Sequence, residues 1–113
     1  AAVELPPMLT ANLLQQLQWQ KREHLLTDEQ VQIVLDGFNL GLVRRATPLD
    51  VMVSIEQTHG IPRYKQRILF EQGIFARKIR VDLFESHIFV EKPMLPEKTD
   101  ALKAYSDWFR RAP

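Results

Sequence analysis

The chain has 113 residues, of which 45% are hydrophobic and 26% charged, with a formal net charge of +1. These values predict a single ordinary globular domain with a modest core. No apolar run approaches the roughly 18 residues that a membrane span needs, and we expect no signal peptide, because a basic stretch followed by an apolar one is missing. Cysteine is absent, which excludes disulfides and thiolate metal sites and favours a reducing compartment, the cytoplasm.

The first segments read as a lead-in followed by a helix. Pro6-Pro7 indicate an extended lead-in over residues 1–9, and residues 10–113 are expected to form the domain. Thr10 can cap a helix that runs to about Leu26. Leucines recur on it at helical spacing, with Gln and Lys opposite, so they are expected to face the core. These leucines are Leu13, Leu14, Leu17 and Leu25.

A second helix has the strongest start signal in the chain. Thr27-Asp28-Glu29-Gln30 is a capping box, in which the Thr hydroxyl and the Gln side chain each bond to the backbone near the other. Its expected buried stripe is Val31, Val34, Leu35, Phe38 and Leu42. Gly37 and Gly41 lie four apart. They predict either a groove for a partner helix or, as we favour, a helix that Gly41 ends in a left-handed conformation.

Two further helices are predicted around a glycine turn. Thr47-Pro48 starts the third, because Thr caps well and Pro suits the first helical position. Gly60 ends it, and Gly60-Ile61-Pro62 leads into a segment that reaches Gly73. Gly at both ends and Pro near the start favour a short helix there, but the apolar run in residues 66–70 is equally typical of a strand.

After Gly73 the apolar residues recur with a period of two, which is typical of strands. Ile79, Val81 and Leu83 alternate with polar residues, and so do Ile88 and Val90. A β-hairpin is therefore predicted, with its loop around residues 84–86, followed by a C-terminal helix that ends near Arg111. The expected fold class is α+β: about four helices, a β-hairpin and a C-terminal helix.

Charge is distributed unevenly along the chain. Residues 61–80 hold six bases against one acid, whereas residues 1–60 hold four bases and seven acids. A local basic patch attracts phosphates or acidic partners whatever the net charge. This run is the strongest functional signal in the sequence.

The basic run falls on a predicted helix-turn-helix followed by a hairpin, which resembles a winged-helix domain. In such domains the second helix enters the major groove of DNA and the wing lies along the backbone. The leading hypothesis is therefore a nucleic-acid-binding regulatory or accessory domain, in which the first part of the basic run reads bases. Its binding residues would be Arg63, Tyr64, Lys65, Arg67, Arg77, Lys78 and Arg80. A homodimer is plausible, because helix-turn-helix proteins usually read paired half-sites.

A non-catalytic interaction or adaptor domain is the alternative, with the same basic surface meeting an acidic protein. Trp19 lies off the leucine stripe and is the candidate for an exposed aromatic anchor. Catalysis is not expected. The three histidines are scattered, and Glu85-Ser86-His87 are neighbours whose side chains diverge, so they cannot form a triad. We also expect no metal and no other cofactor, because no zinc signature or phosphate loop is present.

Overall fold

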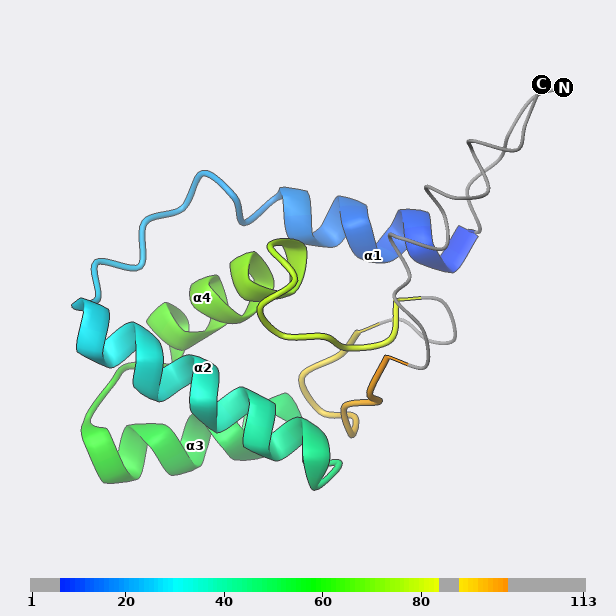
Figure 1. Ribbon diagram of the computed structural model, residues 1–113. Helices are drawn as coiled ribbons and strands as arrows, with labels where there is room; N and C mark the ends of the chain where they lie inside the picture. The colour runs from blue at the N-terminus through cyan, green and yellow to red at the C-terminus, as the bar shows by residue number, and fades with distance from the viewer. Residues whose placement is uncertain (1–6, 84–87, 98–113) are drawn as a thin grey trace, which may run out of the picture.

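The computed structural model describes residues 7–83 and 88–97 of the chain. Within these ranges it contains four helices and no strand (Figure 1). The helices are α1 (Pro7–Leu17), α2 (Asp28–Val43), α3 (Pro48–His59) and α4 (Arg63–Phe75). None of them is long and apolar enough to cross a membrane.

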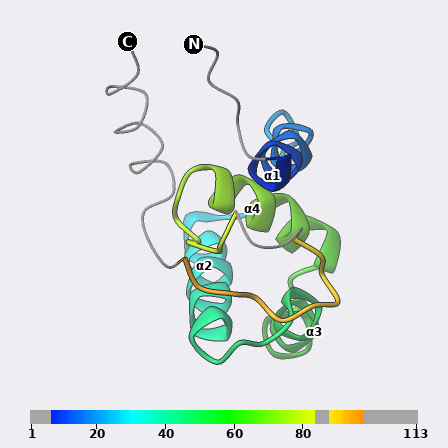
Figure 2. The ribbon, with the colours of Figure 1, turned by 90° about the vertical axis from the view of Figure 1, so that its right-hand side faces the viewer.

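Helix α4 is the centre of the arrangement. It contacts each of the other three helices, α2 and α3 also contact one another, and α1 contacts α4 alone among the helices. Figure 2 shows α4 lying between α1 and the α2–α3 pair. The core lies where α2 meets α4, and there Phe38 and Phe70 stack with ring centroids 4.6 Å apart. Both rings are fully buried, and aromatic side chains of this size dominate the energetics of a small core.

The predicted starts of α2 and α3 are confirmed. Thr27 caps α2, its hydroxyl accepts a hydrogen bond from Gln30 N, and the Gln30 side chain accepts from Thr27 N, which completes the capping box. Thr47 caps α3 in the same manner, accepting from Asp50 N, and Pro48 takes the first turn. Gly60 ends α3 with φ of 70°, a left-handed conformation that glycine adopts without steric cost.

The preferred interpretation of Gly41 as a helix stop is wrong. Both Gly37 and Gly41 lie inside α2, which continues to Val43. A Cβ added at Gly41 would come within 2.5 Å of Val51 Cγ2, and one at Gly37 within 2.6 Å of Ile55 Cδ1. The two glycines therefore allow close packing of a helix, as the other interpretation held, and the helix that packs there is α3 of the same chain.

The ambiguous segment after Gly60 is a helix throughout. Helix α4 includes residues 66–70 and continues past Gly73 to Phe75. Gly73 is again a packing residue, because a Cβ there would lie 3.0 Å from Ile79 Cδ1 and 3.2 Å from Leu35 Cδ2. Burial on several sides of α4 explains why this run resembles a buried strand in the sequence.

The predicted β-hairpin, and with it the α+β class and the winged-helix interpretation, is wrong for the described residues. Ile79, Val81 and Leu83 are buried, but so is Asp82, and the pattern records burial against the helices rather than strand pairing. The backbone of this segment meets residues 95–97, in an isolated bridge between Val81 and Pro96.

The segment expected to pair with residues 79–83 is used elsewhere. The Val90 carbonyl accepts from Leu49 N at the start of α3, and Ile88 N donates to the side chain of Asn12 on α1. Residues 88–90 therefore connect α1 and α3 instead of forming a second strand. The predicted hairpin loop, most of the predicted C-terminal helix and most of the lead-in lie outside the described residues.

Helix α1 differs from its prediction in extent and in face. It begins at Pro7 rather than after Thr10, and it ends at Leu17 rather than near Leu26. Its buried residues are Leu9, Asn12 and Gln16, whereas two of the leucines expected in the core, Leu14 and Leu17, are 56% and 50% exposed. Polar residues are mostly exposed, so the burial of Asn12 and Gln16 marks the face on which α1 packs.

Candidate functional site

The first part of the basic run lies at the start of α4, and acids of the same chain meet its arginines. Arg63 Nε is 3.2 Å from Glu56 Oε1, and Arg63 N donates to Glu56 Oε2. Glu56 lies one turn before the end of α3, so this pair bridges the turn between the helices. Tyr64 is exposed and Lys65 is half-buried. Lys65 forms no ion pair with a described residue.

Arg67 is engaged in holding α1 and its following turn against α4. Its Nε lies 3.1 Å from Oε1 of the buried Glu71, which also accepts from Gln15 Nε2 at 3.0 Å. The Arg67 guanidinium is 5.0 Å from the ring centroid of Trp19, and that of Arg22 is 4.3 Å from the same centroid. Arg67 therefore makes an ion pair and a cation–π contact within the chain, and Trp19 is half-buried rather than an exposed anchor.

The second part of the basic run lies beyond the other end of α4. Glu97 pairs with both Arg77 and Arg80, at 3.4 Å in the case of Arg80 Nε. Lys78 is exposed, and its carbonyl accepts from Asn39 Nδ2. Arg67 and Arg77 are ten positions apart along α4 and its end, which is about 15 Å at 1.5 Å per residue. The structure therefore does not gather the seven predicted residues into one surface, and four of them are paired with acids.

The second residue after the end of α2, and likewise of α4, is an arginine in the left-handed conformation. Arg45 follows α2 with φ of 56°, and Arg77 follows α4 with φ of 63°. At the end of α2, Ala46 N donates to Gly41 O and Arg45 N to Leu42 O; Lys78 N and Arg77 N make the equivalent bonds after α4. These are Schellman motifs, whose left-handed residue is usually glycine, since any other residue is strained there.

The two strained arginines differ in what their side chains meet. The Arg77 guanidinium is largely covered and pairs with Glu97, which accounts for an arginine at that position. Arg45 is exposed, as is Arg44 before it, and neither forms an ion pair with a described residue. Backbone strain that no internal contact offsets is a pointer to function. Arg44 and Arg45 were not predicted as binding residues, because residues 61–80 contain more bases and gave the stronger signal.

A groove of about 230 Å³ opens beside Arg44, between α2 and α3. Glycines and aliphatic residues form most of it, with polar groups at its edges. Its lining residues are Gly37, Leu40, Gly41, Arg44, Ala46, Asp50, Val51, Ser54 and Ile55. The apolar surface extends past the groove, since Leu40 and Val43 are 51% and 80% exposed. This volume is below that of most small-molecule sites, and it suits one or two apolar side chains of a docked segment.

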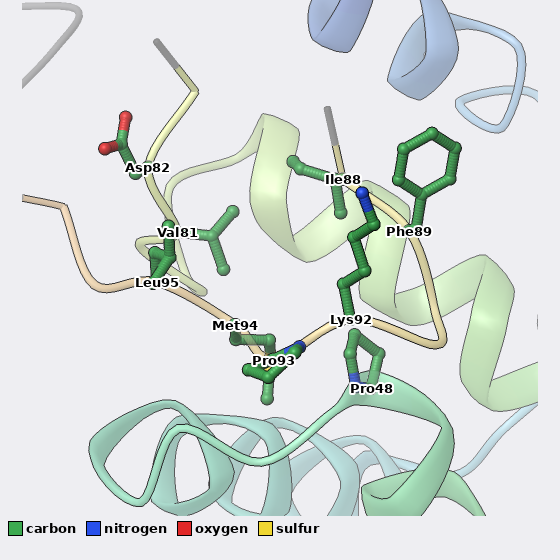
Figure 3. A pocket seen from close by; sticks show the side chains of 9 residues that line it. All are labelled: Pro48, Val81, Asp82, Ile88, Phe89, Lys92, Pro93, Met94 and Leu95. Carbon is green, nitrogen blue, oxygen red and sulfur yellow. The ribbon is translucent and has the colours of Figure 1, made fainter. Parts of the chain in front are cut away.

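A second hollow, of about 30 Å³, lies between the start of α3 and the segment after α4. Figure 3 shows Lys92 extending across it toward Phe89, with Asp82 directed away. The Lys92 ammonium is 5.0 Å from the Phe89 ring centroid, a cation–π contact within the chain. A cavity of this size holds about one water molecule, so it offers no substrate site.

The described residues offer no assembled metal site. Within residues 7–83 and 88–97, no three His, Asp or Glu side chains gather where they could hold a metal ion. Glu85-Ser86-His87 lies outside the described residues.

No protein-family model matches this chain, and it matches no curated protein and no solved structure.

Proposed function

We propose that this chain is a non-catalytic protein-interaction domain, and that it binds an acidic segment of another protein at the groove between α2 and α3. The observation that carries the proposal is Arg45, which keeps a charged, exposed side chain in a left-handed conformation where glycine would be more stable. We also propose a cytoplasmic location, because the chain contains no cysteine and therefore suits a reducing compartment.

The chemistry of the groove defines the partner. Apolar residues line its floor, and Arg44 stands at the end where α2 finishes. The opposite wall carries Asp50 in the first turn of α3. A matching partner places one or two bulky apolar side chains on the floor and a carboxylate beside Arg44 and Arg45. Charge-assisted hydrogen bonds between arginine and carboxylate are among the stronger ones.

Nucleic-acid binding stays a prediction, and the geometry favours it less. Arg63, Arg67, Arg77 and Arg80 already meet acids of the chain. A phosphate would have to compete with Glu56, Glu71 and Glu97 for them. Lys65 and Lys78 are left as the bases of that run without an ion pair to described residues, one near each end of α4.

Selection from a display library of random peptides tests the proposal, because it assumes no partner. Wild-type protein is expected to enrich peptides that combine Asp or Glu with one or two bulky apolar residues. The variant Arg44→Glu/Arg45→Glu is expected to lose those peptides. The matched control Lys65→Glu/Lys78→Glu, which reverses two bases elsewhere, is expected to retain them. Enrichment that ignores acidic residues, or that survives the change at Arg44 and Arg45, contradicts the proposal.

A further inference from the structure

Helix α1 rests on the remainder of the molecule through the fully buried Leu9 and two fully buried polar residues, Asn12 and Gln16. Among the helices it touches α4 alone. Asn12 Nδ2 donates to Leu83 O, and its Oδ1 accepts from Ile88 N. Gln16 is fully buried, yet neither of its side-chain polar atoms has a hydrogen-bond partner. Water satisfies such groups when a helix leaves its site, so a polar contact is lost at lower cost than an apolar one.

The connection between α1 and α2 is strained at one residue. Residues 18–27 contain no helix, and Figure 1 shows them following the edge of the molecule from α1 to α2. Leu25 in this connection has φ of 56° and is 74% exposed. A leucine in the left-handed region is sterically disfavoured, and a side chain so exposed makes little contact that could offset the strain.

The outer face of α1 is apolar and carries no charge. The helix has no ionisable side chain, whereas α2, α3 and α4 each have several. Leu14 and Leu17 lie one turn apart on its exposed side. A second copy of this helix therefore meets no like charge on it.

We propose that two copies of this chain exchange α1, so that each α1 docks on α4 of the other copy. The docking surface is already complementary to α1, through the Gln15–Glu71 hydrogen bond and the packing of Trp19 on Arg67. In the exchanged dimer each of these contacts forms twice, once in each direction between the copies, so no new interface of large area is needed. The connection becomes straight in the exchanged form, which releases Leu25 from its left-handed conformation. The exposed leucines of the two α1 helices, Leu14 and Leu17, can then cover one another. This inference is independent of the proposed partner at the α2–α3 groove.

The molecular mass in solution, measured by light scattering from low micromolar to near-millimolar concentration, tests the exchange. Wild type is expected to move from one chain toward two. Leu25→Gly removes the strain and is expected to raise the dimer dissociation constant by about 5- to 30-fold for each of the two hinges. Leu25→Val makes the left-handed conformation worse and is expected to favour the dimer. A monomer at every concentration, or a dimer that Leu25→Gly strengthens, overturns the proposal.

Isotope-filtered nuclear Overhauser spectra of a mixed dimer distinguish exchange from ordinary pairing. One copy is ¹³C-labelled and the other is not, and the contact between the Trp19 ring and the Arg67 side chain is observed. Exchange predicts that this contact appears between labelled and unlabelled copies. A dimer in which it appears only within one copy overturns the proposal. Both Leu25 variants are expected to bind a peptide selected at the α2–α3 groove as wild type does.

Discussion

Arg45 and Arg77 occupy the same position of the same helix-ending motif, but their side chains meet different surroundings. Both have positive φ, at 56° and 63°. The first is exposed, and the second is largely covered and paired with Glu97. Both arginines therefore carry the steric strain of a positive φ, and only Arg77 offsets that strain with a contact inside the chain.

Replacing each arginine with glycine should change stability in opposite directions. Arg45→Gly is expected to raise the free energy of unfolding by about 1 kcal/mol, because it removes the strain and loses no internal contact. Arg77→Gly is expected to lower it by about 2–4 kcal/mol, because Glu97 loses its covered partner. Urea denaturation of the two variants measures both values. Loss of stability in Arg45→Gly would show that the side chain has a structural role and would remove the argument for function.

Asn12 and Gln16 form a second matched pair, both fully buried on the same face of α1. Asn12→Leu is expected to destabilise the protein by about 2 kcal/mol or more, because a buried N–H and a buried carbonyl are left unsatisfied. Gln16→Met keeps the shape of the side chain and removes polar atoms that have no partner, so it is expected to be neutral or stabilising. Thermal denaturation compares the two. Equal losses would indicate that the Gln16 side chain forms a hydrogen bond in solution.

At the scale of elements, the close approach of α2 and α3 depends on glycine at two positions. A Cβ at Gly41 meets Val51, a β-branched residue whose rotamer is fixed in a helix. A Cβ at Gly37 meets the terminal methyl of Ile55, which can rotate away. The two positions therefore tolerate a methyl group to different extents.

Alanine at these positions should rank accordingly. Gly41→Ala is expected to destabilise by about 1–3 kcal/mol through overpacking, less the helix-propensity gain of about 1 kcal/mol. Gly37→Ala is expected to be close to neutral. Chemical denaturation gives the order, and the reverse order would show that α3 does not pack on α2 as described. Because Gly41 also lines the groove, Gly41→Ala should weaken peptide binding as well.

How far the sequence predicted these elements depends on whether the signal was local. The starts of α2 and α3 and the end of α3 follow from Thr27, Thr47 and Gly60, whose side chains or backbone act within one turn. The packing roles of Gly37 and Gly41 do not follow from the sequence, which favours a helix stop at Gly41, because the residues that they contact lie on another helix.

The errors have a common physical origin in distant contacts. The alternation around Val81 is compatible with a strand, and only its contact with residues 95–97 shows that an isolated bridge forms there. The leucine period of α1 indicates a helix but does not identify its buried face, since Asn12 is held there by backbone groups of residues 83 and 88.

At the scale of the molecule, the basic run loses most of its free charge through folding. Glu56 and Glu97 come from other segments and meet Arg63, Arg77 and Arg80. Sequence blocks of charge therefore overestimate the positive field of the folded chain. Arg44 and Arg45 count for little in such a block, yet both are exposed, and Arg44 lines the edge of an apolar groove.

The most direct test is a fluorescence-anisotropy titration of a selected acidic peptide and a labelled DNA duplex against three proteins, at low and high salt. We predict that wild type and Lys65→Glu/Lys78→Glu bind the peptide equally. Arg44→Glu/Arg45→Glu is predicted to bind it at least about tenfold more weakly, the effect of roughly 1.4 kcal/mol. Duplex binding that falls steeply with salt, and that Lys65→Glu/Lys78→Glu abolishes while the change at Arg44 and Arg45 does not, would contradict the account.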